Sequence, residues 1–387
     1  MKKTLFVLLA ALCLSGSLLA QSAGGNWSIS LTGGAGTILN ANKGWDPMLR
    51  SFSYPAIDLR FGHQTSPDRA SVAAADYLYP EMGIGLSWKG LSTLEFVGEA
   101  TLSDITTLYG YFTGDFLRTR YFSLGYDLAG GLAYTPTVYN PLTHPDLLSY
   151  SSHLLMSLSP GLTAKVRPTR QLEVELNGRF MHMSSGRLSY PNRGLNVLEA
   201  GLRVRWSRKP IPMEKPVKEP FKKHLFYELF AGQGLHACRQ QWYATGETRT
   251  WANYFLSAAA FYRYTRHLSS GIGLDLLLDR EDFLLQLREW ERTLHPDEDL
   301  SEARYSQLSG GLSVLHQFHY GNLALWLQVG YFLYKHKGID EENGRSYQRL
   351  GIKYVFPQMG NLYIATDCRI RNIIYASSME FIIGIRL

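Results

Sequence analysis

The chain has 387 residues, of which 45% are hydrophobic and 19% are charged, a balance that excludes an intrinsically disordered protein. After the N-terminus, no apolar run approaches the roughly 18 residues that a membrane-spanning helix needs. The net charge of +6 is too small to indicate nucleic acid as a partner, and no basic helical patch accompanies it. The 36 glycines and 24 tyrosines are instead typical of proteins built from β-strands.

Residues 1–20 have the features of a secretory signal peptide, namely a basic start, an apolar stretch, and small residues before Ala20. Cys13 lies inside the apolar stretch and follows a leucine, whereas the lipid-modified cysteine of a lipoprotein follows a small residue. An uncleaved anchor helix is the alternative, which the shortness of the apolar run disfavours. We therefore expect the chain to be exported and residues 1–20 to be removed.

Export leaves two cysteines, Cys238 and Cys368, in an oxidising compartment. They can form one disulfide or remain two separate buried thiols, and the sequence leaves both alternatives open. The spacing of the histidines and cysteines matches no zinc site, so we expect neither a metal ion nor another cofactor.

Before residue 208, apolar residues alternate with small or polar ones, which is the period of a β-strand with one apolar face. A soluble β-sandwich alternates in the same way. The signal peptide, the strand length of about ten residues and the aromatic side chains near strand ends favour an outer-membrane barrel, whose apolar face meets lipid. The pattern predicts about eight strands, near residues 26–37, 54–63, 81–90, 106–116, 119–134, 151–166, 170–184 and 195–207.

Residues 208–223 are predicted to be a linker, because residues 208–220 alone contain four prolines and six charged residues. A charged stretch from Glu281 to Ala303 is expected to form a long outer loop that is partly helical. Around that loop the alternation resumes and predicts about eight further strands, near residues 225–235, 250–264, 268–279, 305–318, 322–335, 346–356, 361–371 and 376–387.

The expected fold class is therefore all-β, a transmembrane antiparallel β-barrel. Two tandem eight-stranded barrels, in residues 21–207 and 224–387, fit the two sets of strands. A single sixteen-stranded barrel fits the same count. The proline-rich linker between the sets favours two barrels.

One stretch combines a histidine and a serine on the apolar face of a predicted strand. His182 and Ser184 are two residues apart, so they point to the same side, roughly 6.6 Å apart along the strand. An imidazole beside a hydroxyl is the base and nucleophile pair of acyl transfer. Polar residues that face lipid are costly and usually functional, although the same pair can be ordinary residues of the membrane interface.

The next strand and the turn before it supply further polar groups. Asn196 continues the lipid-facing side whereas Glu199 points to the opposite side, so Asn196 is the candidate third member of a triad with His182. A proline followed by Asn192 and Gly194 is a turn signal that folds the two strands into a hairpin. The Asn192 side chain can then donate a hydrogen bond to an oxyanion.

These residues resemble the motif of the outer-membrane lipid A deacylase family, which is PagL-like and often labelled acyloxyacyl hydrolase. The family pattern is approximately H-x-S-N-G/A, a short variable stretch, and then P-N-x-G-x-E/N. Here His182-x-Ser184 and Pro191-Asn192-x-Gly194-x-Asn196 match it with the family's spacing. The resemblance extends more loosely upstream, through residues 118–134 and Tyr139-Asn140-Pro141, and the two-part chain is similar to the longer members from Bacteroidetes-type bacteria.

The resemblance implies an eight-stranded barrel whose lipid-facing serine attacks an ester-linked acyl chain of lipid A. Ser184 is then the nucleophile, His182 the general base, and Asn196 the residue that orients the base. The resemblance also implies that Asn192 and the backbone N–H of Gly186 form the oxyanion hole.

Two positions depart from the family pattern. Ser185 stands where asparagine is usual, and Asn196 stands where well-known members have glutamate. An amide fixes the tautomer of the imidazole but does not stabilise the imidazolium as a carboxylate does, which lowers the expected activity.

The second half carries no comparable motif, and the polar residues of its last two strands, Arg371 and Glu380, are expected to be a charge pair in the barrel lumen. We interpret this half as a degenerate repeat that kept the barrel and lost the chemistry.

The leading hypothesis is a serine esterase, a carboxylic ester hydrolase that removes an acyl chain from lipid A of lipopolysaccharide in the outer membrane of a Gram-negative bacterium. The alternative is a non-catalytic outer-membrane barrel with a structural, adhesive or transport role. A soluble periplasmic β-sandwich is a third interpretation, which the apolar strand faces disfavour. The sequence indicates no nucleic-acid partner and specifies no oligomeric state.

Overall fold

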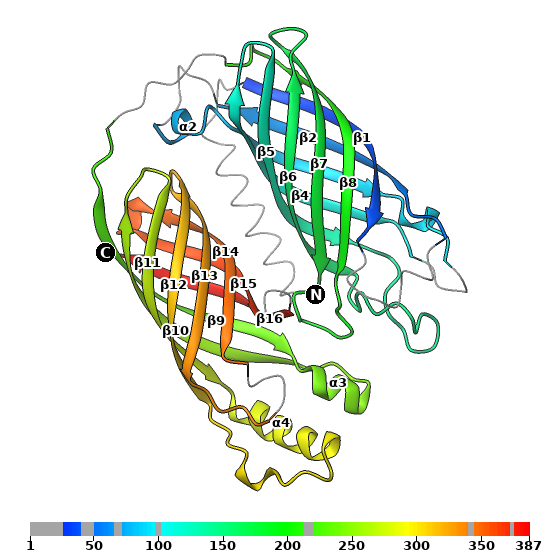
Figure 1. The fold of residues 1–387 in the computed structure, drawn as a ribbon, viewed down its shortest axis with the longest axis vertical. Helices are drawn as coiled ribbons and strands as arrows, with labels where there is room; N and C mark the ends of the chain where they lie inside the picture. The colour runs from blue at the N-terminus through cyan, green and yellow to red at the C-terminus, as the bar shows by residue number, and fades with distance from the viewer. Residues whose placement is uncertain are drawn as a thin grey trace. The chain divides into compact units, whose positions relative to one another are not determined.

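The structure is a computed structural model, and it describes residues 26–39, 50–65, 72–96, 102–212, 220–339, 344–371 and 375–387. The signal peptide expected for residues 1–20 lies outside these residues, as does the middle of the predicted linker, residues 213–219. The chain divides into two compact units (Figure 1). The first unit comprises residues 1–185 and 193–219, and the second comprises residues 186–192 and 220–387.

The first unit is a closed antiparallel barrel in which each strand pairs with the next in sequence and β8 closes onto β1. Closure leaves no sheet edge without hydrogen-bonding partners, which a barrel in lipid requires. The predicted strands agree with the observed ones to within a few residues. The strands are β1 Asn26–Ile38, β2 Tyr54–Gln64, β3 Glu81–Lys89, β4 Ile105–Arg118, β5 Phe122–Tyr134, β6 Leu154–Val166, β7 Leu172–Ser184 and β8 Leu195–Ser207.

Side chains of the first barrel alternate between an apolar outer face and a charged lumen. In β7, Leu176 is 61% exposed on the outer face. Glu175 and Arg179 point to the opposite face, into the lumen, and are buried. Inside, the Arg60 guanidinium donates two hydrogen bonds to Asp127, at 2.9 and 2.7 Å. The charged side chains pair with one another across the lumen, so the barrel is a packed body, as expected for eight strands.

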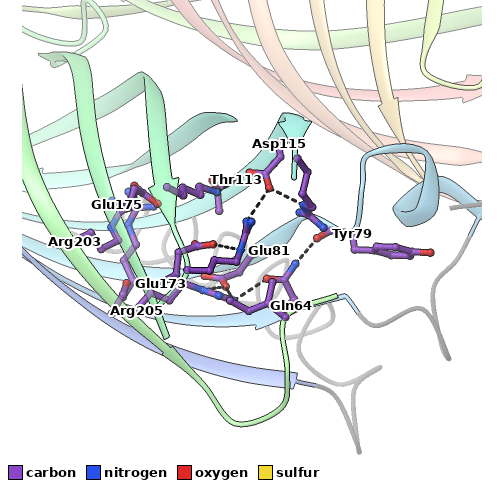
Figure 2. Close-up of a pocket in the computed structure, with 16 residues that line it drawn as sticks. Gln64, Tyr79, Glu81, Thr113, Asp115, Glu173, Glu175, Arg203 and Arg205 are labelled. Atoms are coloured by element: carbon purple, nitrogen blue, oxygen red, sulfur yellow. Dashed lines mark hydrogen bonds and ion pairs between the residues drawn. The ribbon is translucent and has the colours of Figure 1, made fainter. Parts of the chain in front are cut away.

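A polar pocket lies at one end of this lumen (Figure 2). Its charged groups are paired: Lys165 Nζ contacts Asp115 Oδ1 at 2.9 Å, and Arg205 forms an ion pair with Glu81. Glu173, the second residue of β7, lines the pocket, whereas Ser184 ends that strand. The pocket is therefore at the opposite end of β7 from the predicted catalytic residues.

The second unit is a separate closed barrel in which β9 pairs with both β10 and β16. The prediction of two eight-stranded barrels is confirmed, and the alternative of one sixteen-stranded barrel is wrong. Polar groups again pair inside it, for example Lys353 with Glu228 at 2.6 Å. The strands are β9 His224–Ala237, β10 Thr250–Arg263, β11 Leu268–Asp279, β12 Leu308–Tyr320, β13 Leu323–Tyr334, β14 Ser346–Phe356, β15 Leu362–Arg371 and β16 Tyr375–Arg386.

The helices are short and lie in the connections between strands. The stretch expected to be partly helical forms α4, whose residues Phe283, Leu287 and Trp290 are buried in one cluster with Trp251 of β10. Within the described part of the chain, no helix combines the length and apolar character needed to cross a membrane. The α-helices are α2 Val72–Asp76, α3 Arg239–Thr245 and α4 Glu281–Leu294, and the 3-10 helices are η3 Leu91–Thr93, η4 Leu300–Glu302 and η6 Pro357–Met359.

Neither cysteine of the barrels is in a disulfide. Cys238 is buried at the end of β9, Cys368 is partly buried in β15, and both are free thiols. Of the two alternatives left open by the sequence, the structure therefore has separate thiols.

The start of the predicted linker packs onto the first barrel. Asn26 Nδ2 donates a hydrogen bond to the carbonyl oxygen of Lys209 at 3.0 Å, and Arg118 Nη1 donates one to that of Pro212. Ile211 between them is buried.

Candidate active site

The hairpin of β7 and β8 brings the three predicted triad residues together. Its register places His182 directly opposite Asn196. His182 Nδ1 lies 2.7 Å from Asn196 Oδ1, and His182 Nε2 lies 3.0 Å from Ser184 Oγ. The three side chains therefore form one continuous chain of hydrogen bonds.

The order of these contacts favours one tautomer of the neutral imidazole. The Asn196 carbonyl oxygen only accepts, so His182 Nδ1 donates to it and Nε2 is left unprotonated. Nε2 then accepts the hydrogen bond of the Ser184 hydroxyl. An unprotonated nitrogen facing a hydroxyl is the arrangement of a general base with its nucleophile.

The triad residues continue the outward face of their strands. Phe180 precedes His182 on that face and is 37% exposed, and His182 is half-buried. Ser184, at the end of β7, is only 7% exposed. The polar chain thus begins where the apolar outer face ends, with its hydroxyl largely covered.

The nearby acid Glu199 points into the lumen, away from His182. Its carboxylate accepts hydrogen bonds from Arg179 Nε at 2.8 Å and from the Tyr54 hydroxyl at 3.0 Å. Glu199 is buried among these partners. The amide of Asn196, and not this carboxylate, contacts the imidazole.

Gly194 packs against the imidazole, a role that its place in the turn motif did not reveal. A Cβ at this position would lie 2.6 Å from His182 Cε1, and the backbone is left-handed, with φ of +74°. Its N–H donates to the Ser149 carbonyl oxygen at 2.9 Å, which ties the turn to the connection between β5 and β6. Burial raises the pKa of the neighbouring Tyr150 to about 12. Glycine is required here because both the conformation and the space exclude a side chain.

The two predicted oxyanion-hole residues lie in the connection between β7 and β8. Gly186 has a left-handed backbone, with φ of +61°, and is the second residue after Ser184. Asn192 follows the Tyr190–Pro191 peptide bond, which is cis. Both belong to the segment 186–192 that groups with the second unit. Their role in binding an oxyanion stays a prediction.

The corresponding hairpin of the second barrel, β15 and β16, has a different character. Asp367 of β15 lies opposite Glu380 of β16, and both are buried. Glu380 forms ion pairs with Arg349 at 2.9 Å and with Arg369 at 3.1 Å. Glu380 is therefore a lumen charge that pairs with Arg349 and Arg369, and its predicted pairing with Arg371 stays a prediction. The hairpin sequence contains no histidine.

Two other histidine and serine pairs occur in the second barrel. The triplet His267-Leu268-Ser269 has the H-x-S spacing, but Ser269 Oγ contacts His319 Nε2 in the lumen, at 2.8 Å. On the outer side, Ser270 Oγ lies 2.9 Å from His316 Nδ1 across β11 and β12. The sequence did not reveal this second pair because its members come from different strands.

Within the described ranges, no group of three or more histidine, cysteine, aspartate or glutamate side chains is arranged to hold a metal ion.

Each of the two barrels matches the model of a known protein family. A model described as lipid A 3-O-deacylase (PagL) matches residues 20–205, and one described as acyloxyacyl hydrolase, C-terminal domain (PagL_C) matches residues 225–387. The chain belongs to the PagL lipid A deacylase family. Membership in the PagL family assigns lipid A deacylation, a hydrolase activity, in general terms, and the outer membrane as its location. No curated protein matches the chain at a significant level.

Solved structures similar to this PagL-family chain include transport barrels. The toluene transporter TodX of Pseudomonas putida is 10% identical, with 97% of this chain and 92% of that chain covered and a TM-score of 0.18. A mutant of the Rh. blastica porin is 8% identical, covers 93% of this chain and 99% of its own, and has a TM-score of 0.18. The NanC porin is 7% identical, covers 92% and 97%, and has a TM-score of 0.16. The assignment of the fold rests on the strand pairing within each barrel.

Proposed function

We propose that the chain is a serine esterase that removes an ester-linked acyl chain from lipid A. Ser184 is the nucleophile, His182 the general base, and Asn196 the residue that orients the base. The observation that supports this most strongly is the chain of hydrogen bonds, 2.7 Å from Asn196 to His182 and 3.0 Å from His182 to Ser184. Family membership supports the substrate.

The proposed reaction has two steps. Ser184 Oγ attacks the carbonyl carbon of the acyl ester while His182 Nε2 takes its proton. When the ester bond to the sugar oxygen breaks, His182 returns that proton to the leaving oxygen and the acyl group stays on Ser184. Water then attacks this second ester with His182 as base again, which releases the fatty acid and restores the serine.

The position of the triad suits a substrate that is itself a lipid. An acyl ester at the membrane surface reaches an outward-facing serine from the bilayer, whereas a serine in the lumen is screened by the strands. Phe180 and the other apolar residues of this face lie alongside the path of the acyl chain. We assign the chemistry to residues 21–207 and a non-catalytic role to residues 224–387, and residues 1–20 direct export.

Asn192 and the N–H of Gly186 are the proposed donors to the oxyanion of the tetrahedral intermediate. Donors of this kind stabilise charge that exists only in the transition state, and removing one costs about 10²- to 10³-fold in kcat. The amide of Asn196 holds the tautomer of His182 but leaves the imidazolium without a carboxylate. We therefore expect a working but slow enzyme.

The test is mass spectrometry of lipid A from cells that express the full chain or a variant. Wild type is expected to shift lipid A by the mass of one acyl chain, and Ser184→Ala is expected to abolish the shift. Ser270→Ala is the matched control, because Ser270 also contacts a histidine on the outer face but lies in the second barrel. If the wild type folds and lipid A is unchanged, the esterase proposal is wrong. The alternative is then a non-catalytic barrel with a structural, adhesive or transport role.

A further inference from the structure

One end of the first barrel exposes several cations. It is the end that holds the polar pocket, and three of its connections are residues 118–122 at the turn from β4 to β5, residues 167–171 between β6 and β7, and residues 208–212 after β8. We call these three connections the linker-side rim. Their sequence contains no acidic residue. Their exposed cations are Arg120, Arg170, Arg208 and Lys209.

Two further arginines of the linker-side rim neutralise the acids of the pocket beneath it. Arg118 Nε lies 2.7 Å from Asp115 Oδ2, and Arg167 Nε lies 2.9 Å from Glu173 Oε2. Both carboxylates are buried. The positive charge of the exposed cations therefore comes in addition to the charge that pairs inside the lumen.

The opposite rim of the same barrel, where the triad lies, has no such excess of cations. Among its described residues, two exposed cations are balanced by two exposed acids, namely Arg50, Arg193, Glu95 and Asp146. The two rims of one barrel thus differ in charge, and the difference is not a property of the composition as a whole.

Backbone hydrogen bonds join the connections of the linker-side rim to one another and to β1. The Arg167 N–H donates to the Tyr121 carbonyl oxygen at 2.9 Å, and the Ile211 N–H donates to that of Arg170 at 2.8 Å. The Arg208 N–H donates to the Trp27 carbonyl oxygen at 2.8 Å. The backbone positions from which the cations project are therefore fixed around the end of the barrel.

Exposed aromatic side chains lie directly beside these cations. Tyr121 is 60% exposed, and the guanidinium carbon of Arg120 lies 5.2 Å from the centroid of its ring. Trp206, two residues before Arg208, is 50% exposed on the outer face of β8. Tyrosine and tryptophan on the outside of a membrane barrel mark the level of the membrane interface. The cations of the linker-side rim consequently lie at the depth of the lipid headgroups.

We infer that the linker-side rim binds the phosphate groups of anionic phospholipids. Guanidinium groups match the oxygens of a phosphate in geometry and charge, and each cation held at an anionic leaflet contributes about fivefold in affinity. A barrel that spans a bilayer places its two rims in opposite leaflets. Because the proposed function puts lipid A at the rim of the triad, the linker-side rim meets the phospholipid leaflet, and this choice of lipid rests on the proposed function.

The experiment measures which lipids the purified full chain holds at its surface in bilayers of phosphatidylcholine. Trace phosphatidylglycerol or phosphatidylcholine with a spin-labelled acyl chain is added, and electron paramagnetic resonance gives the fraction of each that is immobilised. All forms carry Ser184→Ala, so that the proposed activity cannot cleave the probes. The parent is expected to prefer phosphatidylglycerol about fivefold at low salt and less than twofold in 1 M salt, which screens exposed charges.

Three sets of substitutions separate the rim from charge in general. Arg120→Ser, Arg170→Ser and Arg208→Ser together are expected to reduce the preference to less than about twofold. The matched control removes three exposed cations elsewhere, through Arg50→Ser, Arg280→Ser and Arg288→Ser, and is expected to keep the preference of the parent. Replacing the three rim arginines by lysine keeps the charge and is expected to keep at least half of the preference. The heat-dependent shift of barrels in gel electrophoresis checks that each form is folded.

The outcomes separate this inference from the proposed function. A folded parent that holds the two lipids equally overturns the inference, whatever the mass spectra of lipid A show. A loss of preference shared by the matched control overturns it as well, because net charge and not the linker-side rim then selects the lipid. A loss shared by the lysine form also contradicts it, since the cations are still present there. Unchanged lipid A in cells contradicts the proposed function and does not alter the measured lipid preference.

Discussion

Both ring nitrogens of His182 take part in hydrogen bonds, and the two bonds have different roles. Asn196 fixes the proton on Nδ1, and Ser184 donates to the free Nε2. The pairing of His182 with Asn196 was predictable because both positions follow from the period of two along adjacent strands. The packing of Gly194 on the imidazole was not, because a turn glycine has the same sequence signal whether it touches a catalytic side chain or open solvent.

Gly194→Ala is expected to lower activity at least about tenfold, since the new Cβ would lie 2.6 Å from His182 Cε1 and would displace the ring from its partners. Gly321→Ala is the matched control, because Gly321 is also left-handed, with φ of +58°, and has nothing within 4 Å of its Cβ position. Lipid A deacylation by the two variants, per folded protein, is compared with wild type. Equal activities would mean that the ring tolerates the methyl group.

At the scale of strands and connections, the regular alternation of apolar and polar residues made the strands predictable. It carried no information on which distant segments the connections contact. The observed β8, β11 and β14 have the predicted bounds, because each contains at least four apolar residues in succession on one face. The charged stretch after residue 280 was expected to be partly helical, and α4 occupies its first half. The contacts of residues 186–192 with β9 and β10 have no local signal, since they join positions 50 and 62 residues apart in the sequence.

The lumen charges of the first barrel support its strands. Arg60 is buried and bonded to Asp127 and to the Tyr109 hydroxyl. Arg60→Met removes both hydrogen bonds to buried Asp127, which keeps only the more distant Arg203 at 3.6 Å, so we expect a loss of about 3 kcal/mol in the free energy of unfolding. The exposed pair of Arg280 with Asp282 provides the control, Arg280→Met, with an expected effect of at most about 0.5 kcal/mol. Urea unfolding of both variants in detergent measures this, and similar midpoints would show that the lumen pair is dispensable.

At the scale of the whole molecule, the length of the chain is explained by two closed barrels of the same strand number. The linker composition predicted this division. Sequence alone did not predict that the division by contacts departs from the order of the chain, with residues 186–192 inside the first barrel's hairpin but grouped with the second barrel. Composition changes mark linkers, and they carry no information on which body a loop packs against.

Neither barrel should conduct ions, because buried side chains fill both lumens. The second lumen, for example, holds Asp275 bonded to Ser313 and Gln328, both at 2.7 Å. The full chain in planar bilayers is expected to show no stepwise conductance under conditions in which a porin of similar chain length does. Stable channels of porin size would contradict the two packed lumens.

The boundary between the two units runs through the peptide bond that joins Ser185 to Gly186, one residue beyond the proposed nucleophile. A cut in the linker therefore leaves residues 186–192 on the first-barrel fragment but without the unit with which they group.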